Sequence, residues 1–258
     1  MEKNVPPKKD LPLAVVIMAA GKGTRMKDPS KAKVMYEVLG RPMIHYVVEL
    51  ANMLGAVRSI AIVGYQREAV VAYLQRAHPN VEIAVQAEQL GTGHAVMQAE
   101  TALSGLPCQV VVLSGDVPLL TAQTMEELIK VHQQSESAAT ILTAEFPDPT
   151  GYGRIVRKAD GSVARIVEHK DATEDERRIT EINSGIYIFD RPKLFEALKS
   201  ITPQNVQKEY YLTDVFECFR RNDWRVSAVR TSHREEILGI NTVDQLEDVK
   251  RVLLARQS

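Results

Sequence analysis

Apolar runs of strand length alternate with stretches of helical period through the first half of the chain. Four runs contain almost only apolar residues, at residues 13–19, 59–64, 81–86 and 109–115. Such runs are typical of strands that are buried on both faces of a parallel sheet. Apolar positions recur at helical spacing at residues 43–54, 67–77, 94–103 and 124–132. Pro42 is placed to open the first of these helices and Gly55 to end it. This alternation predicts a doubly wound α/β sheet with helices on both faces.

The pattern changes after Ala144. Residues 154–167 alternate in polarity around an Asp160-Gly161 turn, which predicts a β-hairpin. The other predicted elements of this half are strands and helices at residues 181–190, 191–200, 226–232 and 243–256. The second half therefore has an α+β pattern, and we expect it to pack onto the same sheet, which makes the sheet mixed but mainly parallel.

The predicted organisation is a short tail followed by one domain. We expect residues 1–11 to form a flexible tail and residues 12–258 to form a single domain. Within that domain, residues 12–144 carry the mainly parallel first part and residues 145–258 carry the elaborated second part.

Composition narrows the class of protein. The 258 residues are 45% hydrophobic and 25% charged, which excludes disordered and fibrous classes. The net charge of −1 provides no general attraction to nucleic acid or to an anionic membrane, so any phosphate recognition must be local. No signal peptide or membrane-spanning segment is recognisable, and we expect a cytoplasmic protein with no nucleic-acid or membrane partner. Cys108 and Cys218 lie in apolar surroundings and are expected to be reduced, without a disulfide or metal role.

The loop after the first strand is the strongest local signal for chemistry. Gly21 and Gly23 flank Lys22 directly after the strand, and Arg25 follows two residues later. Closely spaced glycines let the backbone approach a bulky anion, and an arginine can donate two hydrogen bonds to phosphate oxygens. The spacing is neither a Rossmann fingerprint nor a Walker A loop, because Met26 stands where the third Rossmann glycine would be. A plain glycine-rich turn is the alternative.

Two further loops follow predicted strands of the same sheet. Residues 86–94 combine a glutamine with a second glycine loop that opens a helix, a setting that attracts anions. Alternatively, Thr92 is only an N-cap and His94 only a packed or capping residue. Asp116 follows the fourth strand and could bind a divalent metal, or merely cap a turn. Because ligands bind beyond the carboxyl ends of parallel strands, the three loops together predict a nucleotide or sugar-phosphate enzyme.

Eight separated motifs occur in the order of a known family. They lie at residues 19–26, 89–94, 115–119, 151–155, 167–172, 181–186, 209–214 and 239–241. On these motifs the chain resembles the uridyltransferase domain of the bacterial N-acetylglucosamine-1-phosphate uridyltransferases, which are sugar nucleotidyltransferases. The resemblance runs from about Leu13 to the last helix. It implies the nucleotide-diphospho-sugar transferase fold, with residues 12–144 binding the nucleotide and residues 145–258 the sugar.

The resemblance also implies roles for individual residues. Arg25 and Lys33 would be the catalytic cations on the triphosphate. The nucleotide would contact Met18, Ala19, Ala20, Gly21, Gly23, Gln86, Gly91, Thr92, Gly115 and Asp116. The sugar would contact Gly153, Glu168, Asn183, Tyr211 and Thr213. Asp116 and Asn241 would hold Mg²⁺. From the residues alone, Asn183 could instead be a polar residue at a strand bulge, Glu168 a surface charge and Asn241 an N-cap.

The sequence departs from the family pattern in three places. The family's Pro-Lys-Val is here Ala32-Lys33-Val34 after one extra residue, so the phosphate lysine is assigned to Lys33, with Lys31 and Lys27 as alternatives. Met18 replaces the usual leucine, a change that nearly conserves volume. The chain also ends where the bifunctional enzymes continue into a repeat domain, so acetyl transfer is not expected of it.

The expected reaction joins UTP and a sugar 1-phosphate to give a UDP-sugar and pyrophosphate. The product implied by the resemblance is UDP-N-acetylglucosamine, a cell wall precursor. One alternative is the same reaction with another sugar 1-phosphate or with dTTP. Another is a regulatory protein that binds a nucleotide sugar without turnover.

Overall fold

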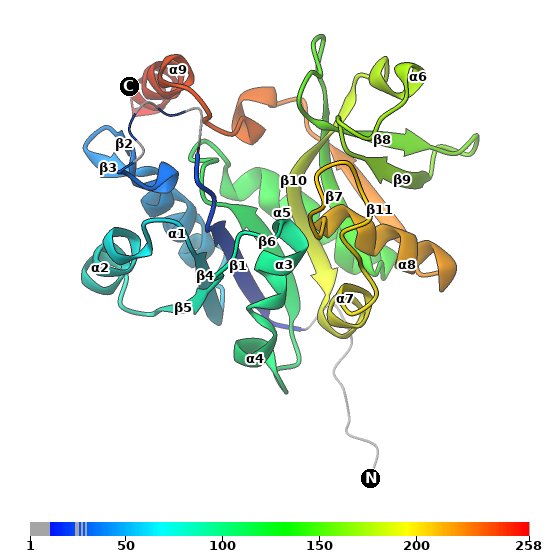
Figure 1. Cartoon of the computed structure of the whole chain (residues 1–258), viewed down its shortest axis with the longest axis horizontal. Coiled ribbons are helices and arrows are strands. Elements are labelled where there is room, and N and C mark those ends of the chain that lie inside the picture. The colour runs from blue at the N-terminus through cyan, green and yellow to red at the C-terminus, as the bar shows by residue number, and fades with distance from the viewer. Residues whose placement is uncertain (1–10, 24–25, 27, 29, 258) are drawn as a thin grey trace.

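A single mixed sheet runs through both halves of the chain (Figure 1). The computed structural model describes residues 11–23, 26, 28 and 30–257. In this part of the chain the main sheet has nine strands, and its central path has the order β11-β7-β10-β6-β1-β4-β5. The strands of the first half are β1 (Leu13–Ala19), β4 (Arg58–Val63), β5 (Val81–Val85) and β6 (Gln109–Ser114), and they pair in parallel.

The second half extends this sheet through β10 (Glu181–Asp190). This strand pairs antiparallel with β6 on one side and with β7 (Ala139–Glu145) on the other. Strand β11 (Val226–Arg230) then pairs in parallel with β7. The predicted hairpin is confirmed as β8 (Gly153–Arg157) and β9 (Val163–Val167), and β8 also pairs with the start of β10. The sheet is therefore mixed but mainly parallel, as the sequence predicts.

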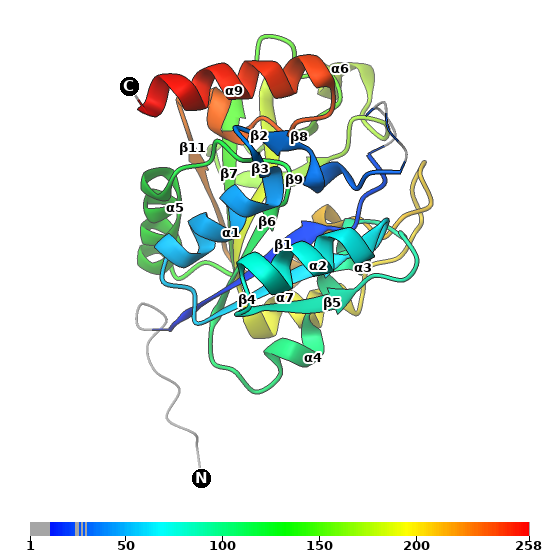
Figure 2. The same cartoon turned by 90° about the vertical axis from the view of Figure 1, so that its left-hand side faces the viewer.

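Helices cover both faces of the sheet because alternate strand residues point to opposite sides. Val15 and Ile17 of β1 pack into one core with α1 (Met43–Met53), α2 (Arg67–Ala77) and α5 (Ala122–Ser135). Ala14 and Val16 pack into the other core with α3 (Thr92–Met97), α4 (Glu100–Leu103), α7 (Arg191–Leu198) and α8 (Val215–Arg221). The two views of the chain show these layers (Figures 1 and 2). The doubly wound prediction is confirmed.

The end of the chain packs against its beginning. Helix α9 (Val243–Gln257) lies beside the small sheet of β2 (Glu37–Val38) and β3 (Arg41–Pro42), as Figure 2 shows. A third, smaller hydrophobic cluster lies between these segments and contains Val38, Met43, Ile240 and Leu246. The remaining elements are short: η2 (Lys33–Met35), α6 (Glu174–Arg177), η3 (Leu212–Asp214) and η4 (Arg234–Ile237). No helix in the described part of the chain is both long and apolar enough to cross a membrane.

The prediction of one continuous helix over residues 94–103 is wrong, because the structure has two short helices there, α3 and α4. The side-chain amide of Gln98 donates to the carbonyl oxygen of His94 at 2.9 Å. That oxygen is the acceptor that the backbone N–H of Gln98 would use in an α-helix. The backbone N–H of Gln98 bonds instead to Ala95, and that of Ala99 to Val96, which tightens the turn and ends α3.

Candidate active site

A cleft of about 490 Å³ opens at the carboxyl ends of the parallel strands. Its volume is in the range of pockets that hold small-molecule ligands. The predicted nucleotide and phosphate residues that line it are Met18, Ala19, Ala20, Gly21, Lys33, Gln86, Gly91, Thr92 and Asp116. The loops after β1, β5 and β6 therefore meet at one place, as the strand order requires.

Two predicted glycines do not line the cleft but support the segment that carries Lys33. Gly23 has φ +60°, and a Cβ there would lie 2.6 Å from the Cβ of Lys33. A Cβ on Gly115 would lie 3.0 Å from Val34 and 3.1 Å from the carbonyl oxygen of Met18. A side chain at either position would push against η2 or β1. These glycines let the loops after β1 and β6 pack closely against η2 and β1.

Three residues that are distant in the sequence meet at the polar end of the cleft. The Lys33 ammonium forms an ion pair with the Asp116 carboxylate and donates to Oδ1 of Asn241 at 2.8 Å. The side chains of Lys33 and Asp116 are each only 14% exposed. The backbone also ties the loops together, because the N–H of Ile240 donates to the carbonyl oxygen of Asp116 at 3.1 Å. The two predicted metal ligands therefore point at one position.

The donor set at this position fits a divalent cation. A carboxylate oxygen and an amide oxygen converge on the cationic head of Lys33, so their shared environment already favours positive charge. Oxygen donors of this kind suit hard cations such as Mg²⁺. Asn241 does not serve as the N-cap of α9, since Thr242 accepts from the backbone N–H of Gln245 there.

The second glycine loop packs closely against the chain that leads into η3. Gly91 has φ +113°, and a Cβ there would lie 2.6 Å from the carbonyl oxygen of Tyr210. Gln86 is buried and its amide donates to the carbonyl oxygen of Gly91 at 3.0 Å. The same amide contacts Nδ1 of His94 at 3.1 Å, so His94 helps to orient Gln86. The N-cap interpretation of Thr92 is wrong, because Gly91 is the N-cap of α3 and the hydroxyl of Thr92 accepts from the N–H of Leu212.

Four of the predicted sugar residues form a second group beside η3. The hydroxyl of Thr213 donates to Glu168 at 3.0 Å. A Cβ on Gly153 would lie 3.4 Å from Cβ of Asn183 and 3.5 Å from Glu168, so a side chain at Gly153 would fill the space between them. Asn183 is buried, donates to the Tyr187 hydroxyl at 2.7 Å and lies where the register between β10 and β7 shifts.

Tyr211 is placed differently from the other four. Its hydroxyl donates to Asp171 at 3.2 Å and accepts from the side chain of Gln207 at 2.8 Å. The chain from Glu209 to Thr213 nevertheless links the two groups, because Glu209 lines the cleft and Thr213 reaches Glu168. The predicted sugar residues do not line the cleft itself, although the 209–213 segment runs from the cleft to the bond between Thr213 and Glu168.

Acidic groups near the second group have raised pKa values. Burial is the main cause of the raised pKa of Glu168, whose side chain is held by Thr213. Burial and then the nearby carboxylates of Glu168 and Asp171 raise the pKa of Asp214 to about 6. This part of the structure therefore holds protons that the unfolded chain would release at the same pH.

Replacement of Asp214 tests this charge crowding. The folded protein keeps the Asp214 proton up to about pH 6, whereas the unfolded chain releases it near the ordinary aspartate pKa of 3.8, so stability falls as pH rises through this window. We expect Asp214→Asn to raise the free energy of unfolding by about 1–2 kcal/mol at pH 7, after allowance for solvent screening, and to change it little below pH 4. Urea unfolding at both pH values measures this.

Asp160→Asn is the matched control with the opposite sign. The Asp160 carboxylate accepts from the hydroxyl and the N–H of Ser162, and these bonds lower its pKa. The control variant should lose stability at neutral pH, in contrast to Asp214→Asn. A loss of stability in both variants at pH 7 would contradict the assignment of a raised pKa to Asp214.

The cleft is lined by some residues to which the sequence analysis assigned no role, and some predicted residues lie elsewhere or outside the described part of the chain. The cleft is also lined by Lys22, Val34, Gln89, Ala95, Ser114 and Glu209. Most of them lie inside or next to the glycine motifs or the 209–214 motif, so proximity to those motifs was the available signal. Arg25 and Lys27 lie outside the described residues. Lys31 does not line the cleft, and its ammonium lies over the ring of Tyr36, 5.1 Å from the centroid.

The doubly wound sheet and a glycine-lined cleft at its strand ends define a class, the α/β enzymes that act on nucleotides. Residues 14–233 match the family model described as Nucleotidyl transferase, and the chain belongs to that family. Nucleotidyltransferases of this family generally use a divalent metal. The donor set of Asp116 and Asn241 agrees with this requirement.

Curated relatives are similar over nearly the whole of this chain. The bifunctional protein GlmU of Halalkalibacterium halodurans is 48% identical over 241 residues, which cover 93% of this chain and 52% of the relative. The bifunctional protein GlmU of Pelotomaculum thermopropionicum is 46% identical over 244 residues, 95% of this chain and 52% of the relative. The chain thus spans about half the length of the curated relatives it matches.

Two solved structures share the fold. One is a UDP-glucose pyrophosphorylase complexed with UDP-glucose, with a TM-score of 0.77 and 17% identity over 95% of this chain and 100% of that one. The other is a putative glucose-1-phosphate thymidylyltransferase from Bacillus anthracis, with a TM-score of 0.73 and 19% identity over 93% and 94% of the two chains. At these identities the likeness shows the shared fold.

Proposed function

We propose that this chain is a uridyltransferase that makes UDP-N-acetylglucosamine and pyrophosphate from UTP and N-acetylglucosamine 1-phosphate. The observation that carries the proposal is the convergence of Lys33, Asp116 and Asn241 at one end of the glycine-lined cleft. The similarity to GlmU proteins over 93% of the chain supports the choice of sugar. Residues 12–144 bind the nucleotide and residues 145–258 bind the sugar in this proposal.

The chain's own residues act by position and charge. The amides of the Gly21 loop and the buried Gln86 hold the nucleotide, and Lys33 with Arg25 balances the charge of the triphosphate. Asp116 and Asn241 would hold Mg²⁺, which would neutralise charge on the phosphates when bound. Gly153, Glu168, Asn183 and Thr213 position the sugar, and Tyr211 supports them through the 209–213 segment.

The reaction needs no general base from the protein. An oxygen of the sugar 1-phosphate attacks the α-phosphorus of UTP, and the bond from that phosphorus to the bridging oxygen breaks. The electron pair leaves with pyrophosphate. The attacking phosphate is already ionised near neutral pH, so alignment and charge compensation supply the catalysis.

A substrate panel tests the proposal. Purified protein with Mg²⁺ is incubated with UTP or dTTP and with the 1-phosphates of N-acetylglucosamine, glucose and galactosamine, and pyrophosphate release is measured. We expect the highest kcat/KM for UTP with N-acetylglucosamine 1-phosphate. A higher value for another pair would reassign the substrate. Binding of a UDP-sugar with no pyrophosphate release from any pair would show a regulatory protein instead of an enzyme.

A further inference from the structure

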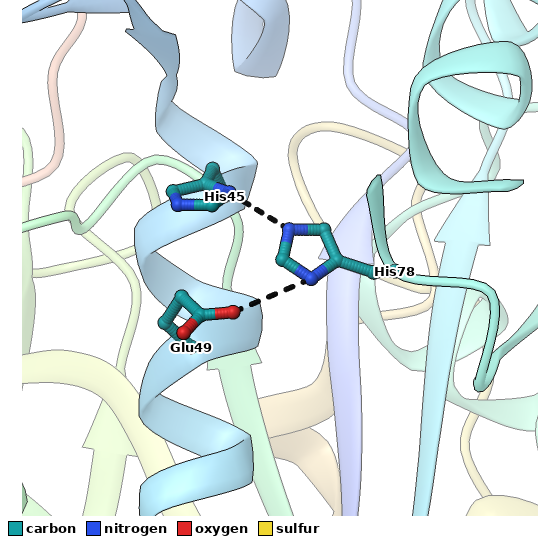
Figure 3. A group of neighbouring side chains, drawn as sticks. All are labelled: His45, Glu49 and His78. Carbon is teal, nitrogen blue, oxygen red and sulfur yellow. Dashed lines mark hydrogen bonds and ion pairs between the residues drawn. The ribbon is translucent and has the colours of Figure 1, made fainter. Parts of the chain in front are cut away.

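A second group of potential metal ligands lies between α1 and the end of α2. His45 and Glu49 are one turn apart on α1, so both side chains project from the same face of that helix. His78 follows directly after α2 and points back toward them (Figure 3). One nitrogen from each imidazole and one carboxylate oxygen all lie within 4.8 Å of one another. None of these residues lines the cleft.

We propose that His45, Glu49 and His78 form a binding site for a first-row transition-metal dication such as Zn²⁺. Two imidazoles and one carboxylate are a common ligand set for zinc, with a fourth position left to water. This set differs from the all-oxygen set of Asp116 and Asn241 and selects a different class of ion. The proposal is thus independent of the uridyltransferase reaction.

The spacing of the two imidazoles is close to what a metal requires. Nδ1 of His45 and Nε2 of His78 lie 2.8 Å apart. Two nitrogens bound to the same tetrahedral zinc at about 2.0–2.1 Å are roughly 3.3 Å apart, so the rings need to separate by only about 0.5 Å. Glu49 faces the other nitrogen of His78, with its carboxylate 3.4 Å from Nδ1 (Figure 3). Because the Glu49 side chain is 48% exposed, it is free to swing toward Nε2, where it would complete the site.

The rings are also in the protonation state that binds metals. His45 and His78 are only 8% and 7% exposed, and burial lowers the pKa of both imidazoles. Neutral imidazole is the form that offers a lone pair to a metal ion. Burial therefore favours the neutral form of both rings, and His45 can bind a metal through Nδ1 once its proton has moved to Nε2.

Two contacts of His45, with Arg41 and with Tyr73, must also rearrange when an ion binds. Nη1 of Arg41 lies 2.5 Å from Nε2 of His45, and a guanidinium can only donate, so the ring proton is on Nδ1. Metal binding at Nδ1 moves that proton to Nε2 and turns the exposed Arg41 side chain outward. The hydroxyl of Tyr73, 3.0 Å from the same Nδ1, must also yield or become a neighbour of the ion.

An ion at this site would connect two helices that support the cleft. Both α1 and α2 contact η2, the segment that carries Lys33. A ligand that binds only the folded protein raises its thermal stability. We therefore expect Zn²⁺ to raise Tm through the link between α1 and α2.

Calorimetric titration of the full chain with Zn²⁺, together with Co²⁺ absorption, tests the proposal. The titrations are made in wild type and in Asp116→Asn, so that the oxygen site is separated from this one. We expect one equivalent to bind in both backgrounds and Co²⁺ to show the visible bands of tetrahedral coordination. His78→Ala should weaken binding by more than about 100-fold and Glu49→Gln by at least about 10-fold, because each removes a direct ligand.

The controls distinguish a site from adventitious binding. His233 is 61% exposed and lies outside the group, so His233→Ala should leave affinity and spectrum unchanged. Glu49→Gln changes a half-exposed side chain, and circular dichroism verifies that it and His78→Ala remain folded. Folded His78→Ala or Glu49→Gln variants that bind Zn²⁺ as wild type does would overturn the proposal. So would the absence of Zn²⁺ binding to a protein that carries Asp116→Asn alone.

Discussion

Asp116→Asn is expected to lower kcat by about 10²–10³-fold while the protein stays folded. The carboxylate is only 14% exposed, pairs with Lys33 and lies opposite Asn241, so it is the main negative charge at the predicted metal position. The amide that replaces it has nearly the same shape and can still accept a hydrogen bond from Lys33. The substitution therefore removes charge while it preserves packing, and the apparent KM for Mg²⁺ should rise as kcat falls.

Steady-state kinetics at a series of Mg²⁺ concentrations measure this effect, and circular dichroism and Tm verify the fold. Asp160→Asn is the matched control, because it makes the same chemical change in the β8–β9 turn, away from the cleft. It should keep wild-type kcat and wild-type dependence on Mg²⁺. Full activity of Asp116→Asn would remove the metal assignment.

Lys33→Ala is expected to cost a similar factor, about 10²–10³ in kcat/KM for UTP. Lys33 lines the cleft, and its ammonium donates hydrogen bonds to both Asp116 and Asn241. Loss of the ammonium leaves more of the negative charge of the triphosphate uncompensated. It also removes the ion-pair partner of the Asp116 carboxylate. Lys33→Arg should recover only part of the loss, since a planar guanidinium does not replace a compact ammonium between two oxygens.

Lys31→Ala is the internal control, and it decides between the two lysines that the sequence left open. Lys31 lies over the ring of Tyr36, and a partly exposed contact of this kind contributes only about 1 kcal/mol. This variant should retain nearly all activity. If Lys31→Ala were the damaging change and Lys33→Ala were mild, the assignment of the phosphate lysine would be wrong.

The fold was largely predictable because its signals are local. Continuous apolar runs such as residues 13–19 and 109–115 identify buried strands, and helical spacing identifies the covering helices. The rule that parallel strands place their carboxyl ends at one edge then predicts that the loops after them meet. The break between α3 and α4 was not predictable in this way, because the apolar spacing continues through it and only the backbone bonds of Gln98 and Ala99 show the tightened turn.

The candidate site was predictable in its parts but not in its assembly. The glycine loops and Asp116 can be recognised from their position after strands. The meeting of Lys33 with Asn241 joins residues 208 positions apart, and no local pattern encodes such a contact. The interpretation of Asn241 as an N-cap was a fair local alternative, and it is wrong because Thr242 already caps the helix.

By itself, the sequence determined the class of fold, the edge of the sheet where ligands bind and the family motifs, since strand periodicity and glycine placement are properties of short segments. Only the tertiary structure decided which lysine reaches Asp116, how η3 connects the cleft to Glu168, and that His45 and His78 face each other across two helices. The physical reason is that these contacts depend on how helices and loops pack across the sheet, and packing is a sum of many weak long-range interactions.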